Sequence, residues 1–219
     1  MKKTTLAVLL AALPLAAAAQ DPVKVDAGHY KVLLDNASVR VLKVAVPAGA
    51  KSPMHSHPDA ILVPFASGKA RFTMPDGTTQ DLELVKETAS WTPAMTHSPA
   101  NLGTAAIEGI LVEFKGAPGT ATLPAARAGL QSTTLVENPR AVAIKTTAAP
   151  EFHEAAGTTH EYDQVVIALG AAEMMIAMDG KTPVSKWQRG DVQFIGRGVK
   201  HESKNTSGKP IEFIVVAIK

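Results

Sequence analysis

The sequence predicts an all-β protein built from two copies of one domain placed in tandem. Residues 35–115 can be laid over residues 137–219 with few gaps, and matched residues stay 102 to 104 positions apart. His57 with His160, and His97 with His201, are among the matched pairs. A repeat of this length is a whole domain copied once, because the units of a solenoid are shorter.

Each copy consists of short apolar segments separated by turn signals. The segments that resemble strands most are 39–46, 60–65, 105–114, 164–169 and 211–218. Gly68 and Gly170 follow two of them, and the Asp-Gly pairs at 76–77 and 179–180 are typical of hairpin turns. Many short strands at regular spacing favour an antiparallel sandwich or barrel.

The segment between the copies, 116–136, is rich in Gly, Ala, Pro and Thr. We interpret it as a linker, with one short helix near 124–130. The expected domains are therefore a first barrel over 28–115 and a second over 137–219.

The first 19 residues have the pattern of a secretory signal. Lys2 and Lys3 precede an apolar run over 6–18, and small residues at 17 and 19 precede Gln20. We expect cleavage there and a periplasmic or secreted protein, with no membrane partner after the signal is removed. The sequence contains no cysteine, which excludes disulfides and a lipoprotein anchor.

The charge of the chain gives little support to a nucleic-acid partner. Lys and Arg number 22 against 20 Asp and Glu, and two of the lysines belong to the predicted signal. No basic cluster with interleaved aromatic residues occurs. We therefore expect no nucleic acid, and a small-molecule ligand or substrate instead.

Three histidines of the first copy have a spacing suited to metal binding. His55 and His57 are two residues apart, so in a strand they point to the same face. His97, from a later strand, would complete a set of three imidazole nitrogens that leaves coordination positions open. The alternative is three polar histidines satisfied by hydrogen bonds. The repeated spacing favours a divalent transition metal, with Fe, Mn, Ni, Cu and Zn not distinguished.

With these residues the chain resembles the cupin superfamily in its two-domain, bicupin arrangement. Gly49, His55, His57 and Gly68 fit the first family motif, with Ile61 in its glutamate position. The glycines, histidine and asparagine of the second motif are matched by Gly190, Gly198, His201 and Asn205. The resemblance implies two tandem jelly-roll (cupin) β-barrels, a metal in at least one of them and a homodimer. We also expect Ile61 to face the metal site, four residues after His57.

The second copy has a weaker set of ligands. His160, Gln164 and His201 match ligand positions, and Thr158 takes the place of the first histidine. Alternative donors are Glu161 or Asp163, if a bulge turns one of them inward, and His153. We expect His160, Gln164 and His201 to hydrogen-bond a polar organic ligand.

Two functions follow from these features. The first is a metal-dependent, dioxygenase-type oxidoreductase that acts on a small organic substrate through His55, His57 and His97. The second is a non-catalytic module that binds a small ligand or a metal. The sequence has no cysteine nucleophile, no G-x-S-x-G elbow and no P-loop.

Overall fold

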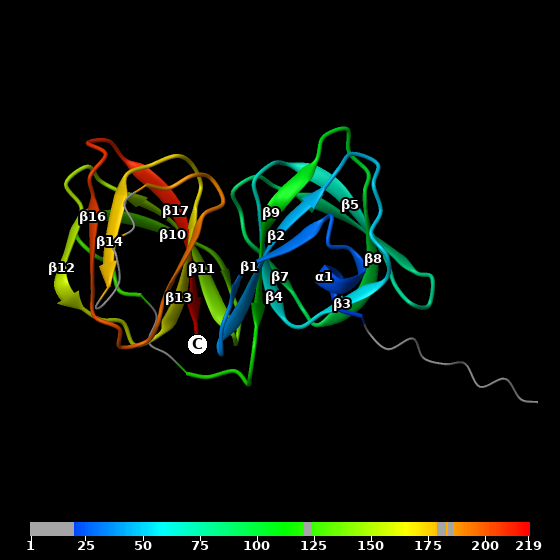
Figure 1. The fold of residues 1–219 in the computed structure, drawn as a ribbon, viewed down its shortest axis with the longest axis horizontal. Helices are drawn as coiled ribbons and strands as arrows, with labels where there is room; N and C mark the ends of the chain where they lie inside the picture. Colours follow the sequence, from blue (N-terminus) through cyan, green and yellow to red (C-terminus); the bar gives the residue numbers. More distant parts are fainter. Residues whose placement is uncertain (1–19, 121–123, 179–182, 184–185) are drawn as a thin grey trace, which may run out of the picture.

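A computed structural model describes residues 20–120, 124–178, 183 and 186–219. The predicted signal and the Asp-Gly turn at 179–180 lie outside these residues. In the part of the chain that is described, the protein is almost entirely β-structure, with one short helix, α1 (Pro22–Val25). The strands form two barrels that lie side by side (Figure 1).

The first barrel consists of two antiparallel sheets. Its five-stranded sheet has the order β1-β2-β9-β4-β7, with β1 (Tyr30–Asp35), β2 (Val39–Val46), β9 (Ile107–Phe114), β4 (Ala60–Pro64) and β7 (Ser90–Thr92). Its four-stranded sheet has the order β3-β8-β5-β6, with β3 (His55–His57), β8 (Met95–Asn101), β5 (Gly68–Thr73) and β6 (Thr79–Leu84). Alternate residues of β2 and β9, such as Leu42 and Leu111, fill the interior between the sheets.

The second barrel has the same plan. Its five-stranded sheet has the order β10-β11-β17-β13-β15, with β10 (Leu130–Glu137), β11 (Ala141–Ala148), β17 (Ile211–Ile218), β13 (Asp163–Ala168) and β15 (Val192–Ile195). The opposite sheet has the order β12-β16-β14, with β12 (His153–Thr158), β16 (His201–Asn205) and β14 (Met174–Met178). An aromatic and aliphatic interior that includes Trp187, Phe213 and Ile176 separates the two sheets.

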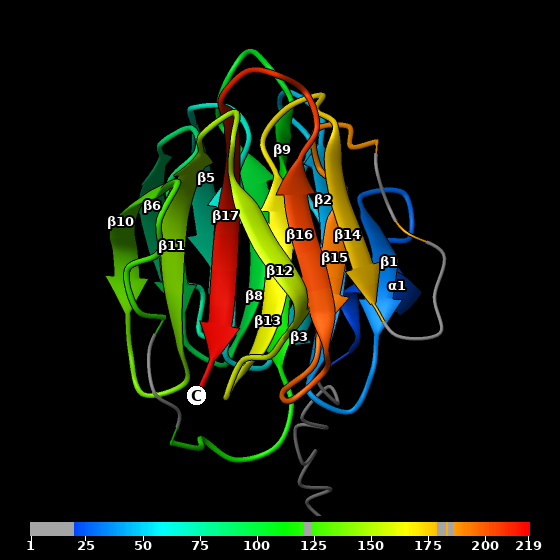
Figure 2. The same ribbon diagram turned by 90° about the vertical axis from the view of Figure 1, so that its left-hand side faces the viewer.

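The largest apolar core lies between the barrels, where the two five-stranded sheets pack face to face (Figures 1 and 2). Ile61, Ile110 and Val112 of the first barrel share this core with Val165 and Ile214 of the second, all fully buried. These strands are therefore buried on both faces, which explains their nearly continuous apolar sequences.

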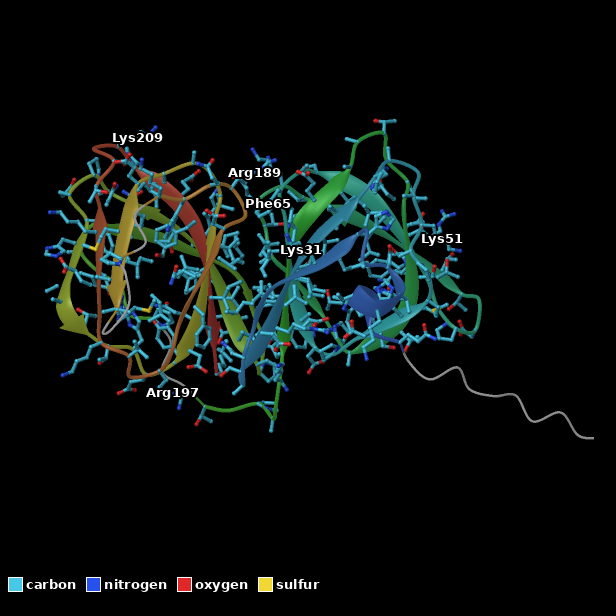
Figure 3. The ribbon with its side chains drawn as sticks, in the orientation of Figure 1. Lys31, Lys51, Phe65, Arg189, Arg197 and Lys209 are labelled. Atoms are coloured by element: carbon cyan, nitrogen blue, oxygen red, sulfur yellow. The ribbon has the colours of Figure 1, made fainter. Side chains whose placement is uncertain are left out.

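Polar contacts close the edges of this junction. The guanidinium of Arg189 lies 5.7 Å from the ring centre of Phe65 and 3.2 Å from a carboxylate oxygen of Glu108 (Figure 3). Ser38 donates a hydrogen bond of 2.5 Å to Asp163 from the other barrel. The two barrels thus form one packed unit.

The structure differs from two expectations for the segment 116–136. Strand β10 starts at Leu130, inside the segment assigned to the linker, and pairs with β11 along its length. Its sequence, LQSTTLVE, is mostly polar because five of its eight residues are exposed at the sheet edge, so it lacks an apolar run. Residues 124–130 form no helix.

No helix among the described residues is long and apolar enough to cross a membrane.

Candidate metal centre

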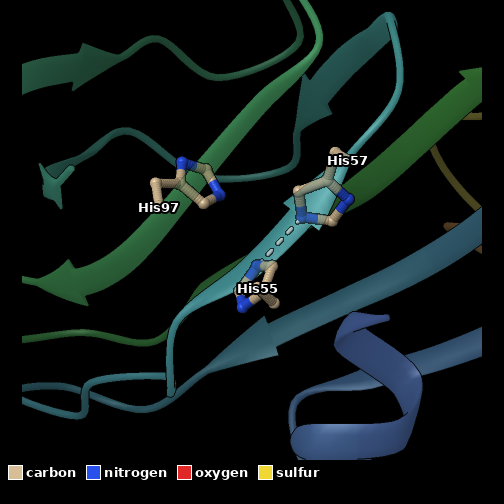
Figure 4. Close-up of side chains that lie close together, drawn as sticks. All are labelled: His55, His57 and His97. Atoms are coloured by element: carbon tan, nitrogen blue, oxygen red, sulfur yellow. Dashed lines mark hydrogen bonds between the residues drawn. The ribbon is translucent and has the colours of Figure 1, made fainter. Parts of the chain in front are cut away.

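Three buried histidines converge inside the first barrel. Strand β3 carries His55 and His57 on one face, and His97 lies directly opposite His55 on the paired strand β8 (Figure 4). The three residues are 0%, 6% and 3% exposed, and their donor nitrogens all lie within 4.8 Å of one another. The structure thus brings together all three ligands expected from the sequence.

Hydrogen bonds to Nδ1 fix the orientation of two of these rings. Nδ1 of His55 donates to the carbonyl of Pro53 over 2.8 Å, and Nδ1 of His57 donates to Oε1 of Glu113 over 2.6 Å. In neutral rings Nε2 then carries a lone pair. The two Nε2 atoms face each other at 3.0 Å (Figure 4). Two lone pairs at that distance repel each other unless a cation, either a proton or a metal ion, binds between them.

His97 supports a metal rather than a proton. Both of its ring nitrogens are buried and have no hydrogen-bond partner in the structure. A buried polar group without a partner is costly, and such a group in a native structure requires an explanation. Burial, with the adjacent His57 and His55, lowers the pKa of His97 to about 3. The ring is therefore neutral at pH 7, which is the form that binds a metal.

A chain of charged groups extends outward from His57. Glu113 is 1% exposed, and its second oxygen accepts a hydrogen bond of 2.5 Å from Arg40, the residue opposite it on β2. Arg40 in turn pairs with Asp21, which also caps α1 by accepting from the amide of Val23.

A backbone hydrogen bond also ties the N-terminal segment to β3. The amide of Ser56 donates to the carbonyl of Gln20 over 2.9 Å. The first described residues are thus anchored behind strand β3.

A mainly apolar pocket lies beside His57 and His97. Its walls include Phe72, Leu84 and Leu111. The ring centre of Phe72 lies 4.1 Å from the ring centre of His97. A pocket of this kind accepts the carbon skeleton of a small organic molecule and leaves orientation to a few polar groups.

The second barrel contains a different cluster, formed by Glu154, His160 and His201. The side chains of His160 and His201 are 2% and 0% exposed, and that of Glu154 is 11% exposed. Their donor atoms also lie within 4.8 Å of one another. The amide of Gly198, which has a φ of +70°, donates to the carbonyl of His160 and holds the turn before His201 in place.

Comparisons with known proteins give a clear result only at the level of structure. No protein-family model and no curated protein matches the sequence. A cupin 2 conserved barrel domain protein from Leptotrichia buccalis superposes with a TM-score of 0.56, 11% identity and coverage of 87% of this chain and 88% of the other. The protein has the cupin fold.

Two bicupin enzymes match over both barrels. Salicylate 1,2-dioxygenase from Pseudaminobacter salicylatoxidans has a TM-score of 0.63 and 11% identity, covering 86% of this chain and 76% of its own. A variant of oxalate decarboxylase from B. subtilis has a TM-score of 0.57 and 12% identity, covering 83% of this chain and 69% of its own. The identities are low, so these matches establish the cupin fold and no particular reaction.

The predicted orientation of Ile61 is wrong. We expected this residue to face the metal site, but it packs in the core between the barrels, while Ala60 and Leu62 face the barrel interior. Pro58 and Asp59 separate β3 from β4 and shift the alternation by one residue. No side chain at position 61 can therefore reach the three histidines from this register.

Sequence reasoning missed the carboxylate groups that the structure places at the two cupin sites. Glu113 is one of two acids in the apolar run 105–114, and an acid on a buried strand face is a signal that could have identified it. Glu154, and not Glu161 or Asp163, is the acid of the second cluster.

The structure also shows the contacts of the remaining candidates of the second cupin barrel. His153 is half exposed and pairs with Glu202 at 2.8 Å. Asp163 accepts hydrogen bonds from Ser38 and from the amide of Arg197. Gln164 lines an internal pocket together with His160 and Glu154.

Proposed function

We propose that this bicupin is an exported, periplasmic or secreted, metal-dependent oxygenase, and that His55, His57 and His97 hold its ion. The observation that carries the proposal is the state of the six ring nitrogens. The Nδ1 atoms of His55 and His57 are held by hydrogen bonds, and the lone pairs on their Nε2 atoms face each other at 3.0 Å. Both nitrogens of His97 lack a hydrogen-bond partner. An ion bound by these rings would supply open positions for a substrate and dioxygen.

The charge of the site indicates the class of substrate. The donor cluster contains three imidazoles and no carboxylate among the described residues, and the charge of Glu113 is paired with Arg40. A divalent ion there would be bound by neutral imidazoles alone, so its positive charge would favour an organic anion as a further ligand. Salicylate and oxalate, which appear in the names of two structural neighbours, are both small organic acids. The apolar wall that includes Phe72 and Leu84 suits the carbon skeleton of such a molecule.

The residues around the ion have separate tasks in this proposal. His55, His57 and His97 bind the ion, and Pro53 and Glu113 hold the first two rings with Nε2 directed inward. Phe72 and Leu111 exclude water from one side of the site.

The test is metal analysis followed by a screen for oxygen consumption. We expect protein purified from its native compartment to contain about one redox-active ion, mainly in barrel 1. His57→Ala should lose that ion, whereas His153→Ala, which removes a half-exposed histidine paired with Glu202, should keep it. Small hydroxy acids, keto acids, flavonols and thiols are the substrates to screen. Equal metal content in wild type and His57→Ala would refute the assignment.

The second candidate function is a non-catalytic binding module. The observation that favours it is the internal pocket of barrel 2, where apolar residues such as Phe152, Trp187 and Phe213 surround His160, Tyr162 and Gln164. A protein that retains a tight small ligand, contains only zinc or no metal, and consumes no oxygen with any substrate of the screen would support this function instead.

A further inference from the structure

The cluster in barrel 2 already contains a cation, the guanidinium of Arg127. This residue belongs to the segment that precedes β10, and its side chain reaches the pocket lined by Glu154 and His160. Nη1 of Arg127 pairs with Oε1 of Glu154, and it also lies 3.5 Å from Nε2 of His160. The guanidinium therefore contacts two of the three groups that would bind a metal.

Arg127 also uses the lone pair of His160. Its Nη2 lies 2.7 Å from Nδ1 of His160, and because a guanidinium can only donate, Nδ1 must accept. A neutral imidazole has one basic nitrogen, so the ring has no second lone pair to offer to an ion. The ring nitrogens of His201 have other partners than Arg127. Nδ1 lies 3.2 Å from the carbonyl of Val199, and Nε2 lies 3.3 Å from Oε2 of Glu154.

The first barrel places its arginine differently. Arg40 pairs with Glu113, which contacts His57 through Nδ1, on the side of the ring away from the three-histidine cluster. The charge of Arg40 is thus neutralised outside the donor cluster. The charge of Arg127 is neutralised by Glu154 inside its cluster.

We propose that Glu154, His160 and His201 form a second site for a divalent transition metal, and that Arg127 occupies its cation position and keeps barrel 2 free of metal. The donor set of two imidazoles and one carboxylate suits Fe²⁺, Co²⁺ and Zn²⁺. All three donors are nearly buried, and they come together from β12, β16 and the loop before β13. An ion and the guanidinium cannot share the site, because both need the negative charge of Glu154 and the basic nitrogen of His160.

The experiment measures Co²⁺ binding in the otherwise complete mature chain after His55→Ala and His57→Ala have removed the barrel 1 site. This background separates the proposal from the function proposed above, because no ion in barrel 1 contributes to the signal. We expect the double variant to bind almost no Co²⁺, as judged by equilibrium dialysis and visible absorption. Adding Arg127→Met should create a site for about one equivalent. Adding Glu154→Gln or His201→Ala to that protein should abolish it.

Two further variants control for side effects. Arg197→Met removes an exposed arginine at the edge of barrel 2 (Figure 3) and should create no Co²⁺ site. Arg127→Gln keeps a polar side chain, and it replaces Arg127→Met if the methionine variant does not fold. The proposal is overturned if the double variant with Arg127 intact already binds one equivalent that His201→Ala removes. It is also overturned if a folded variant without Arg127 binds no Co²⁺.

Discussion

At the scale of single residues, Glu113 is the group whose role at the proposed metal centre can be isolated best. It accepts from Nδ1 of His57 and is held by Arg40. Groups in this position fix the ring orientation of a ligand and raise its basicity, and their loss typically costs 10- to 100-fold in metal affinity. We therefore expect Glu113→Gln to bind metal about 10- to 100-fold more weakly than wild type, measured by competition with a chelator.

The matched control is Glu83→Gln, which changes an exposed glutamate paired with Lys69. It should leave metal affinity unchanged. An affinity of Glu113→Gln equal to that of Glu83→Gln would mean that the carboxylate does not support the ligand.

His97 makes the stability of the metal-free protein depend on pH. Its pKa is about 3 in the folded protein, mainly because of burial, against about 6.5 in an unfolded chain. Between these values the unfolded chain binds a proton that the folded chain does not. The free energy of unfolding therefore falls as pH falls below 6.5, by about 1.4 kcal/mol per pH unit from this residue. Above pH 7 the protonation of His97 does not change the free energy of unfolding.

Urea unfolding of the metal-free protein between pH 7.5 and 4.5 measures this dependence. His97→Gln should have a shallower slope than wild type, because it removes the buried imidazole. Equal slopes for wild type and His97→Gln would contradict the expected contribution.

At the scale of strands, the alternation of side chains predicts their direction correctly within one continuous strand. It does not predict their direction across a break between two strands. His55 and His57 lie on one strand, so their common direction could be predicted. Ile61 lies beyond a break between strands at Pro58 and Asp59. The pattern of apolar and polar residues does not show that this break shifts the inward-facing positions by one residue. Glu113 and Arg40 meet through the pairing of β2 with β9, which no local pattern encodes.

The register of β4 leads to a prediction about Ile61. Because Ile61 is fully buried between the barrels, Ile61→Glu should place an unpaired charge in an apolar core. We expect an unfolded or strongly destabilised protein, without a fourth metal ligand. Ile61→Val should fold and lose only about 0.5 to 1.5 kcal/mol. Thermal denaturation distinguishes these results, and a stable Ile61→Glu protein with an added carboxylate ligand would show that the register is wrong.

At the scale of the whole molecule, the presence of two barrels could be predicted from the paired motifs, but their mutual packing could not. The apolar faces of β4, β9, β13 and β17 look in sequence like the core of a single barrel, because a strand buried on both faces has no polar side. The structure assigns one face of each strand to its own barrel and the other to the shared core. We therefore expect the barrels to depend on each other for stability.

This dependence leads to the last prediction. The chain has two tryptophans, of which Trp91 packs against the shared core from barrel 1 and Trp187 lies in the interior of barrel 2. Trp91→Phe and Trp187→Phe therefore give two proteins, each with a fluorescent reporter in one barrel. Ile214→Ala, which opens the shared core from the side of barrel 2, should cost about 2 to 5 kcal/mol.

We expect both reporters to show the same unfolding midpoint in urea, and Ile214→Ala to lower both midpoints equally. The reason is that losing either barrel exposes the apolar sheet of the other to water, so a state with one folded barrel is unstable. Two separate transitions, with only the Trp187 signal shifted by Ile214→Ala, would show that the barrels fold independently. The matched substitution Ile176→Ala, in the interior of barrel 2, tests whether the coupling extends beyond the shared core, and it too should shift both signals.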